Sequence, residues 1–227
     1  MSRFLSLLVA VSVASTSFVG VAGAGAPIEV SPRLTGVCDG TQDCKVVATR
    51  DVDGDGHRDR VGRVLHPDGR VTMRVLTSEG MLRRKTVDAS DWYGDPWHGA
   101  AGIDGRRGVE LVVGHLVGAH TEFFKVLTWR AGELVVERDP SGDATWVVDS
   151  SVNFNIGVWR RVVDGEVLVR LRSAVRGAAG HGHNGRDVTY HWAHKRWNKV
   201  SSIHRHYRSD AAAFRIGGWH VGSLPRF

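Results

Sequence analysis

Polar and apolar residues alternate along several short stretches of this chain. Residues 70–75 read RVTMRV and residues 166–172 read EVLVRLR, so every second side chain is apolar. A period of two residues is typical of a β-strand with one buried face. Further strands are predicted from Val-rich or aromatic runs at residues 110–113, 123–129, 133–137, 158–163, 188–192 and 197–200. Because these strands are short and closely spaced, and helical periodicity is scarce, we predict an all-β fold.

Turn residues lie between the predicted strands. Asp164 and Gly165 separate residues 158–163 from residues 166–172. An Asp-Gly pair between two strand-like runs predicts a tight hairpin, because both residues tolerate positive φ angles.

The predicted strands recur with a period of about 50 residues. Two dipeptides reappear 51 residues later, Asp53-Gly54 as Asp104-Gly105 and Leu76-Thr77 as Leu127-Thr128. A third, weaker unit begins near Asn155 and lacks the acidic loop of the first. Such a period, with several strands in each unit, predicts blade-like antiparallel sheets. Three blades do not close a propeller, so we expect an open or distorted propeller-like stack, with a β-sandwich as the alternative.

The N-terminal residues have a different pattern from the rest. Arg3 is the only charged residue before Glu29, residues 4–21 are apolar or small, and residues 22–24 read AGA. This order predicts a cleavable signal peptide over residues 1–24. A membrane anchor is disfavoured because serines dilute the apolar run and no basic cluster follows it. No later stretch is long enough to span a bilayer, so we expect a secreted or extracytoplasmic protein without a membrane span.

The two cysteines and the charge pattern narrow the partners and the compartment. Cys38 and Cys44 are predicted to form a disulfide, as expected for an even cysteine count in an exported chain. We expect this disulfide to clip an N-terminal segment, residues 25–50, ahead of a β-rich repeat domain over residues 51–227. The chain has 30 basic and 24 acidic residues, a formal net charge of +6. Because the two signs are interspersed, no nucleic-acid partner is expected.

One loop has the composition of a calcium site. Asp51, Asp53, Asp55 and Asp59 place four carboxylates within nine residues, and His57 stands where a backbone carbonyl could complete the shell. Calcium prefers six to eight oxygen ligands, and carboxylates at alternate positions of a tight loop converge on one point. An acidic turn without an ion is the alternative, but four clustered carboxylates repel one another unless a cation is present. We therefore predict a calcium ion here.

This loop resembles those of a known repeat family. The order Asp-x-Asp-x-Asp-Gly-x-x-Asp, followed directly by a predicted strand, is similar to the calcium loops of FG-GAP/VCBS-type repeats of integrin-like propellers and secreted bacterial proteins. The resemblance implies blades and a calcium ion, and a role in binding macromolecules or as a scaffold. Residues 102–114 resemble a degenerate copy that keeps Asp104 and Glu110. Arg106 and Arg107 stand where ligands are expected, so an arginine would replace the charge of the ion there.

Three other groups of residues are candidates for chemistry or binding. Trp92, Tyr93 and Trp97 would either stack on sugar rings or fill the core. Glu110, His120 and Glu122 would form an acid/base cluster, or His120 is a hydrogen-bonded loop residue. Seven late histidines would hold a transition metal or simply lie on the surface: His181, His183, His191, His194, His204, His206 and His220.

These features favour a binding function over catalysis. We expect a secreted, calcium-stabilised β-rich module of the cell envelope or the medium, used for binding or as a scaffold. An envelope polysaccharide or an extracellular protein is the expected partner. The alternative is a secreted hydrolase or lyase that acts on a polymer through Glu110, His120 and Glu122 or through the late histidines.

Overall fold

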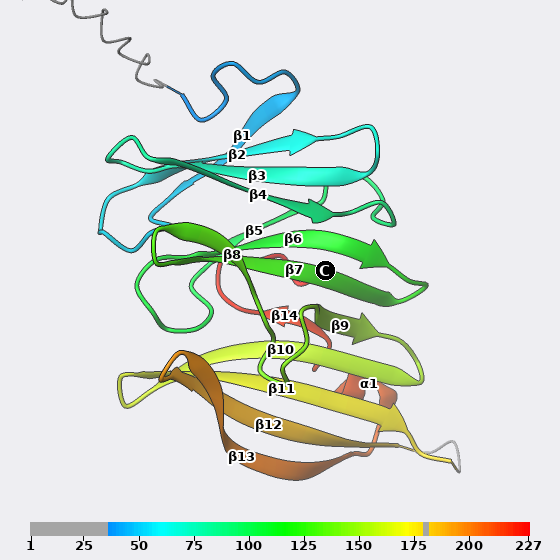
Figure 1. Ribbon diagram of the computed structural model, residues 1–227. Coiled ribbons are helices and arrows are strands. Elements are labelled where there is room, and N and C mark those ends of the chain that lie inside the picture. The colour runs from blue at the N-terminus through cyan, green and yellow to red at the C-terminus, as the bar shows by residue number, and fades with distance from the viewer. Residues whose placement is uncertain (1–35, 179–181) are drawn as a thin grey trace, which may run out of the picture. The chain divides into compact units, whose positions relative to one another are not determined.

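The predicted all-β fold is confirmed. The computed structural model describes residues 36–178 and 182–227, in which nearly all regular structure is β-strand (Figure 1). The predicted signal peptide and His181 lie outside the described residues. Among the described residues, no helix has the length and apolar character needed to cross a bilayer.

The first sheet is a four-stranded antiparallel meander. Its strands follow one another in the order β1 (Cys44–Arg50), β2 (Asp59–Leu65), β3 (Arg70–Leu76) and β4 (Leu82–Asp88). The alternating residues 70–75 form β3, as predicted, with Val71, Met73 and Val75 fully buried. Because β1 pairs with β2, the boundary expected at residue 51 falls between two strands of one sheet.

The predicted disulfide between Cys38 and Cys44 is confirmed, with the two Cα atoms 5.4 Å apart. It fastens the residues before β1 onto the first sheet. The Arg74 side chain donates to the Val37 carbonyl over 2.7 Å, and Gly62 leaves room for Cys44 Sγ, which would lie 3.2 Å from a Cβ at that position. The second face of β3 is therefore covered by the disulfide loop, which explains why Arg74 is buried on a strand of alternating pattern.

The second sheet contains ten strands. They are β5 (Trp97–Ala101), β6 (Glu110–Val117), β7 (Thr121–Arg130), β8 (Glu133–Glu137), β9 (Trp146–Ser150), β10 (Phe154–Val163), β11 (Glu166–Arg176), β12 (His183–Ala193), β13 (Arg196–Tyr207) and β14 (Gly218–His220). The main path runs β13-β12-β11-β10-β9-β7-β6-β5, while β8 pairs with β7 and β14 runs parallel to β10. Strand β9 pairs with the first half of β7 and β8 with the second half, so β9 links the second repeat unit to the third.

The 51-residue period reappears in the strand boundaries. Strands β2, β3 and β4 begin at Asp59, Arg70 and Leu82, and β6, β7 and β8 begin 51 residues later. The third unit departs from this plan, because residues 151–153 alone connect β9 to β10 and no acidic loop lies between them. The predicted Asp164-Gly165 hairpin is present, with Val163 paired to Glu166 across it.

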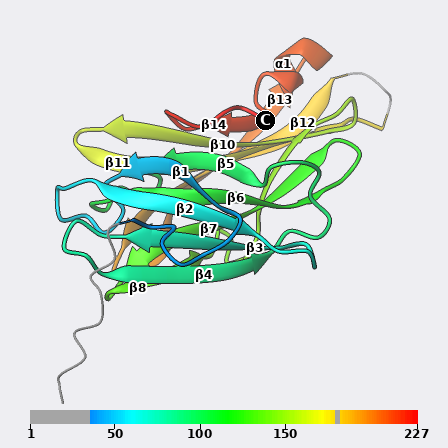
Figure 2. The same cartoon turned by 90° about the horizontal axis from the view of Figure 1, so that it is seen from above.

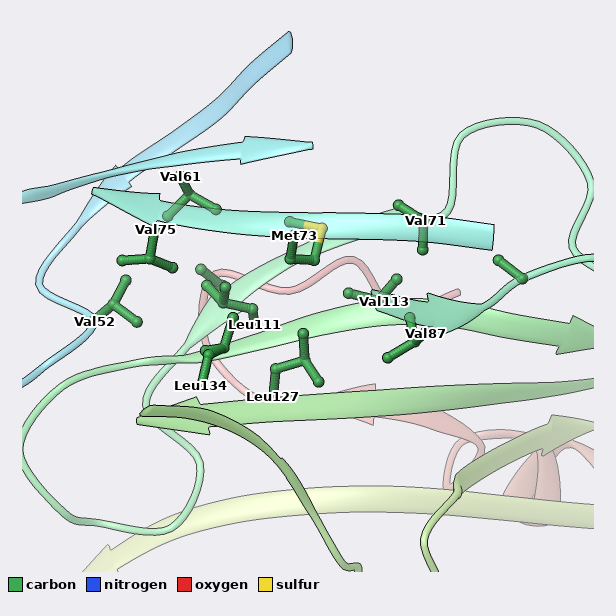
Figure 3. Close-up of a cluster of buried hydrophobic side chains, with 12 residues drawn as sticks. Val52, Val61, Val71, Met73, Val75, Val87, Leu111, Val113, Leu127 and Leu134 are labelled. Carbon is green, nitrogen blue, oxygen red and sulfur yellow. The ribbon is translucent and has the colours of Figure 1, made fainter. Parts of the chain in front are cut away.

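Two apolar cores divide the strands into three layers. The first contains Val71, Met73, Leu111 and Leu127, so it lies between the first sheet and strands β5–β8 (Figure 3). The second contains Val112, which packs toward the third unit and β14 with these other core residues: Phe124, Val126, Trp146, Val148, Val158, Val169 and Trp219. Figure 2 shows β2, β6 and β10 of the three layers lying roughly along one axis, with β10 running opposite to β6 because the pairs β6–β7, β7–β9 and β9–β10 are all antiparallel. The middle layer is thus buried on both faces, and the sheets do not close into a barrel.

Among the residues that the structure describes, one short helix is present, α1 (Asp210–Phe214), and it covers part of the third unit. The side chain of Ser209 accepts a hydrogen bond from the Ala212 N–H and so caps the helix start. The methyl group of Ala213 joins Ala174, Tyr207 and Ile216 in a small third apolar cluster. This packing closes one side of β11 and β13.

Candidate metal centre and cationic cavity

The acidic loop between β1 and β2 brings three carboxylates together. Oxygens of Asp51, Asp53 and Asp59 all lie within 4.8 Å of one another. Asp59 is fully buried as the first residue of β2, whereas Asp51 and Asp53 are partly exposed. The donor set consists of oxygen alone, which suits a hard divalent cation rather than a transition metal.

Asp59 fixes the shape of this loop. Its Oδ2 accepts hydrogen bonds from the N–H groups of Val52 at 2.7 Å and Asp53 at 3.3 Å. Its Oδ1 accepts from the N–H of Ser78 at 3.0 Å, just after β3. A single carboxylate therefore holds the loop and the following turn in one arrangement.

Two of the predicted ligands stand outside the three-carboxylate group. Asp55 is exposed and accepts from the His57 N–H at 2.6 Å and from the Ser78 hydroxyl at 2.8 Å. These hydrogen bonds lower the pKa of Asp55. The His57 side chain is exposed, and its predicted role through the backbone carbonyl stays a prediction.

The electrostatics of the loop favour a cation. Partial burial raises the pKa of Asp53, and repulsion by Asp59, Asp55 and Asp51 adds to the rise despite a backbone hydrogen bond that opposes it. Burial likewise raises the pKa of Asp59 above its usual value. Both carboxylates are therefore costly to ionise in this arrangement, and a bound divalent cation would remove that cost.

The equivalent loop of the second repeat has the same backbone plan. Glu110, 51 residues after Asp59, accepts from the Ile103 N–H at 2.5 Å, just as Asp59 accepts from Val52. Its other oxygen accepts from the Thr128 hydroxyl at 3.1 Å. The two loops are therefore structural counterparts, as their 51-residue spacing predicts.

The second loop contains a buried carboxylate group of its own. Oxygens of Asp104, Glu110 and Glu137 lie within 4.8 Å of one another, and all three side chains are buried. Arg130 forms ion pairs with Asp104 and, at 3.3 Å, with Glu137. The second loop thus has an arginine side chain paired with its carboxylates, as expected, but this arginine is Arg130 of β7. It is not Arg106 or Arg107: Arg106 contacts Asp104 through its backbone N–H only.

One guanidinium does not balance three carboxylates. Burial, together with repulsion by Asp104, raises the pKa of Glu110 to about 7. Burial and repulsion by Glu110 raise the pKa of Glu137 to about 9. At neutral pH, Glu137 therefore holds a proton and is uncharged. The negative charge of Asp104 is balanced by Arg130, so the net charge of the three carboxyl groups and Arg130 is close to zero.

A large cavity opens beside this second acidic group. Its volume is about 780 Å³, and it lies between the ends of β7 and β8, residues 138–142 and the β12–β13 hairpin. Five of its lining residues are basic, namely Arg106, Arg130, Arg138, Lys195 and Arg196. Trp192 and Trp197 supply aromatic walls, and Glu137 and Asp139 are its acids. The sequence did not indicate this site, because its walls come from strands far apart in the chain.

The aromatic cluster proposed from the sequence does not form one surface. Trp92 packs against both cores, with its ring 5.2 Å from Phe124, and Trp97 packs against the first core. Tyr93 is 86% exposed. Trp92 and Trp97 are therefore partly buried against the cores, and of the three rings only Tyr93 is largely exposed.

The structure does not bring Glu110, His120 and Glu122 together. Glu110 is the first residue of β6, while Glu122 pairs with Val117 at the other end of that strand. Seven residues along a strand correspond to about 23 Å. His120 is exposed in the turn between β6 and β7. The acid/base cluster that was one of the two alternatives for these residues is therefore not formed.

The late histidines are dispersed. His183 is buried and its Nε2 lies 3.0 Å from the Val152 carbonyl, and His220 stacks on Trp159 with ring centroids 3.7 Å apart. His204 and His206 are exposed on β13. Within residues 36–178 and 182–227, none of them joins a group of three side chains suited to a metal.

Comparison with protein-family models, with curated proteins and with solved structures found no match for this chain.

Proposed function

We propose that this protein is an exported, calcium-stabilised β-rich module that binds a partner in the cell envelope or the medium. The calcium proposal rests on comparing the charges beside the carboxylates of the two corresponding loops, residues 51–59 and 102–110. In the second loop, Arg130 provides a positive charge to the acidic group. The residue 51 positions earlier is Glu79, in the turn between β3 and β4, so the first loop has no arginine at the position that corresponds to Arg130. An external cation would fill that role.

Calcium fits the donors better than other ions. Asp51, Asp53 and Asp59 offer oxygens only, on a loop with exposed members rather than a closed cage. Calcium accepts irregular shells of six to eight oxygens, including water, whereas magnesium demands near-octahedral geometry. In bound form, calcium would neutralise the carboxylates and fix the connection between β1 and β2.

Binding is favoured over catalysis by the separation of the candidate catalytic residues. The hydrolase or lyase alternative rested on Glu110, His120 and Glu122 or on the late histidines. Glu110 lies at one end of β6 and Glu122 near the other, and within residues 36–178 and 182–227 none of the late histidines joins a group of three metal-ligating side chains. Export is supported by the Cys38–Cys44 disulfide, because such bonds persist in oxidising compartments. Calcium outside the cell also reaches the concentrations that a weak loop site requires.

Thermal unfolding with and without calcium tests this proposal. Calcium at about 100 times its dissociation constant stabilises the folded state by about 2.7 kcal/mol, or about 5–10 °C in midpoint for a domain of this size. The same concentration of magnesium should have a smaller effect. The variant Asp53→Asn keeps the shape of the side chain but removes a ligand charge, so it should lose the calcium response.

The matched control is Asp68→Asn, which removes an exposed carboxylate paired with Arg70 in the β2–β3 turn. This variant should keep the full calcium response. A midpoint that chelator does not change in the unmodified protein would overturn the calcium proposal. An equal loss of response in both variants would show that general charge, and not the loop, is responsible.

A further inference from the structure

We propose that the cavity between β7–β8 and the β12–β13 hairpin binds a short acidic oligosaccharide. The inference names a ligand class for the proposed binding function and rests on it. Its site is distinct from the calcium loop, because none of the residues that line the cavity belongs to residues 51–59. A volume of about 780 Å³ lies in the range of small-ligand sites.

The charge of the cavity selects for an anion. Arg130 is already paired with the buried Asp104, so four basic residues, Arg106, Arg138, Lys195 and Arg196, remain beside two acids, Glu137 and Asp139. The Asp139 carboxylate is occupied by its own loop, since it accepts from the N–H groups of Ser141, Gly142 and Asp143 at 2.8–2.9 Å. Guanidinium groups bind carboxylates and sulfates in paired hydrogen bonds. An anionic ligand group would therefore find several partners here.

The aromatic walls suit a sugar ring. Trp192 and Trp197 stand edge to face, with ring centroids 5.2 Å apart and planes at 80°. Arg130 lies over the Trp192 ring at 5.3 Å, and Trp197 Nε1 donates to the Arg138 carbonyl at 3.1 Å. These contacts hold the two indoles in place before any ligand arrives. An indole offers a flat apolar surface for the C–H face of a pyranose, beside cations that bind its acidic group.

Two residues that line the cavity, Glu137 and Trp192, carry buried polar atoms that a saccharide hydroxyl group could pair with. Glu137 Oε1 and Trp192 Nε1 are buried and have no hydrogen-bond partner among the described residues. One is a carboxyl oxygen and the other a donor, and such orphaned buried groups are rare in folded proteins. A hydroxyl group can both donate and accept a hydrogen bond. A saccharide hydroxyl would therefore pair with Glu137 Oε1 or Trp192 Nε1 once that side chain rotates toward the cavity.

The arrangement of the cations favours a saccharide over a nucleic acid. Single-stranded nucleic acids also stack on aromatic rings, but they require a positive groove that follows the phosphate backbone. Here the five basic residues surround one hollow, and elsewhere basic and acidic residues are interspersed along the chain. A short acidic sugar matches this local concentration of charge.

Isothermal titration of the purified protein in calcium-containing buffer tests the inference. The probes are trigalacturonate, neutral cellotriose, inorganic sulfate and a twelve-residue oligothymidylate. We expect trigalacturonate to bind at least about tenfold more tightly than each of the other three, a difference of about 1.4 kcal/mol.

The decisive variant is Arg138→Gln/Arg196→Gln, which removes two exposed cations from the cavity. Its matched control is Arg84→Gln/Arg208→Gln, which lowers the net charge equally at exposed positions that do not line the cavity. We expect at least a tenfold loss of trigalacturonate affinity in the first and less than a twofold change in the second. Thermal midpoints of both variants verify that each is folded.

Several outcomes would overturn the inference. Trigalacturonate binding no tighter than sulfate would leave only non-specific anion binding, and tighter oligothymidylate binding would make the cavity a nucleic-acid site. Equal losses in both double variants would place the interaction outside the cavity. The two proposals fail separately: trigalacturonate binding without a calcium response contradicts the calcium loop alone, and a calcium response without binding contradicts the cavity alone.

Discussion

At the scale of single residues, buried carboxyl groups are the feature that the sequence pattern indicated least. Glu110 was considered as a residue for binding or acid/base chemistry, yet its side chain is buried against the Ile103 N–H. Glu137 drew no attention as the last residue of a predicted strand, but it is buried beside Arg130 and Glu110. A sequence shows where a carboxylate occurs, whereas its burial and pKa depend on residues from other strands.

Replacing Glu137 should change how stability depends on pH. Its pKa is about 9 in the folded protein, above the usual value of 4.5. The folded state therefore keeps a proton that the unfolded state releases, and stability falls as pH rises from about 4.5 through about 9. Glu137→Gln cannot ionise, so it should flatten this decline and be more stable than the unmodified protein at pH 9, by a few kcal/mol on an order-of-magnitude basis.

Urea unfolding at pH 5, 7 and 9 measures this effect. The control is Glu133→Gln, which removes an acid with 63% side-chain exposure from the same strand. This variant should keep the pH profile of the unmodified protein. A Glu137→Gln profile that still falls with pH would mean that Glu110, whose pKa is also raised by burial, or another group dominates the decline.

At the scale of elements, the two counterpart loops pack directly on each other. A Cβ placed on Gly108 would lie 2.5 Å from the Val52 carbonyl oxygen, and one on Gly54 would lie 2.9 Å from the backbone of Arg107. The hairpins and the 51-residue repeat were predictable, because turn residues and strand periodicity are local signals. The close approach of the loops was not, since it arises when the first two layers stack.

The variant Gly108→Ala should therefore destabilise the protein through this contact. Gly108 has a φ of 93°, and Gly165 in the β10–β11 turn has a similar φ of 81° but no atom within 4 Å of its Cβ position. Gly165→Ala should cost about 1–2 kcal/mol from the left-handed backbone alone. Gly108→Ala should cost about 1–3 kcal/mol more because of overpacking.

Chemical denaturation of both variants gives the comparison. Equal losses would show that the loops separate without penalty, which would contradict their tight packing. A calcium response retained in Gly165→Ala and weakened in Gly108→Ala would further show that loop packing supports the metal site.

At the scale of the whole molecule, the middle layer holds the other two layers together. Leu111 faces the first core and Val112 the second, although they are neighbours on β6. A strand buried on both faces reads as a continuous apolar run instead of an alternating one, as residues 111–113 do. The sequence therefore indicated a strand there, but not that it stands between two layers.

Truncations on the two faces of the middle layer should be similarly severe. Leu111→Ala should destabilise the protein by about 2–5 kcal/mol and Phe124→Ala by about 3–5 kcal/mol, because each leaves a cavity in a core. Val162→Ala is the control, since Val162 is 58% exposed and should change stability by less than about 0.5 kcal/mol. Guanidinium unfolding measures all three, and a mild effect on one face would show that its layer packs loosely.

The sequence by itself determined the all-β class, the hairpin at Asp164-Gly165, the disulfide, the 51-residue repeat and the acidic loop. Each depends on residues close together in the chain or on a regular spacing. Only the tertiary structure decided which carboxylates meet, that Arg130 from β7 stands beside the second acidic group, and that two tryptophans and five cations enclose a cavity. These depend on which strands become neighbours, and burying apolar surface on both faces of the middle layer fixes that choice.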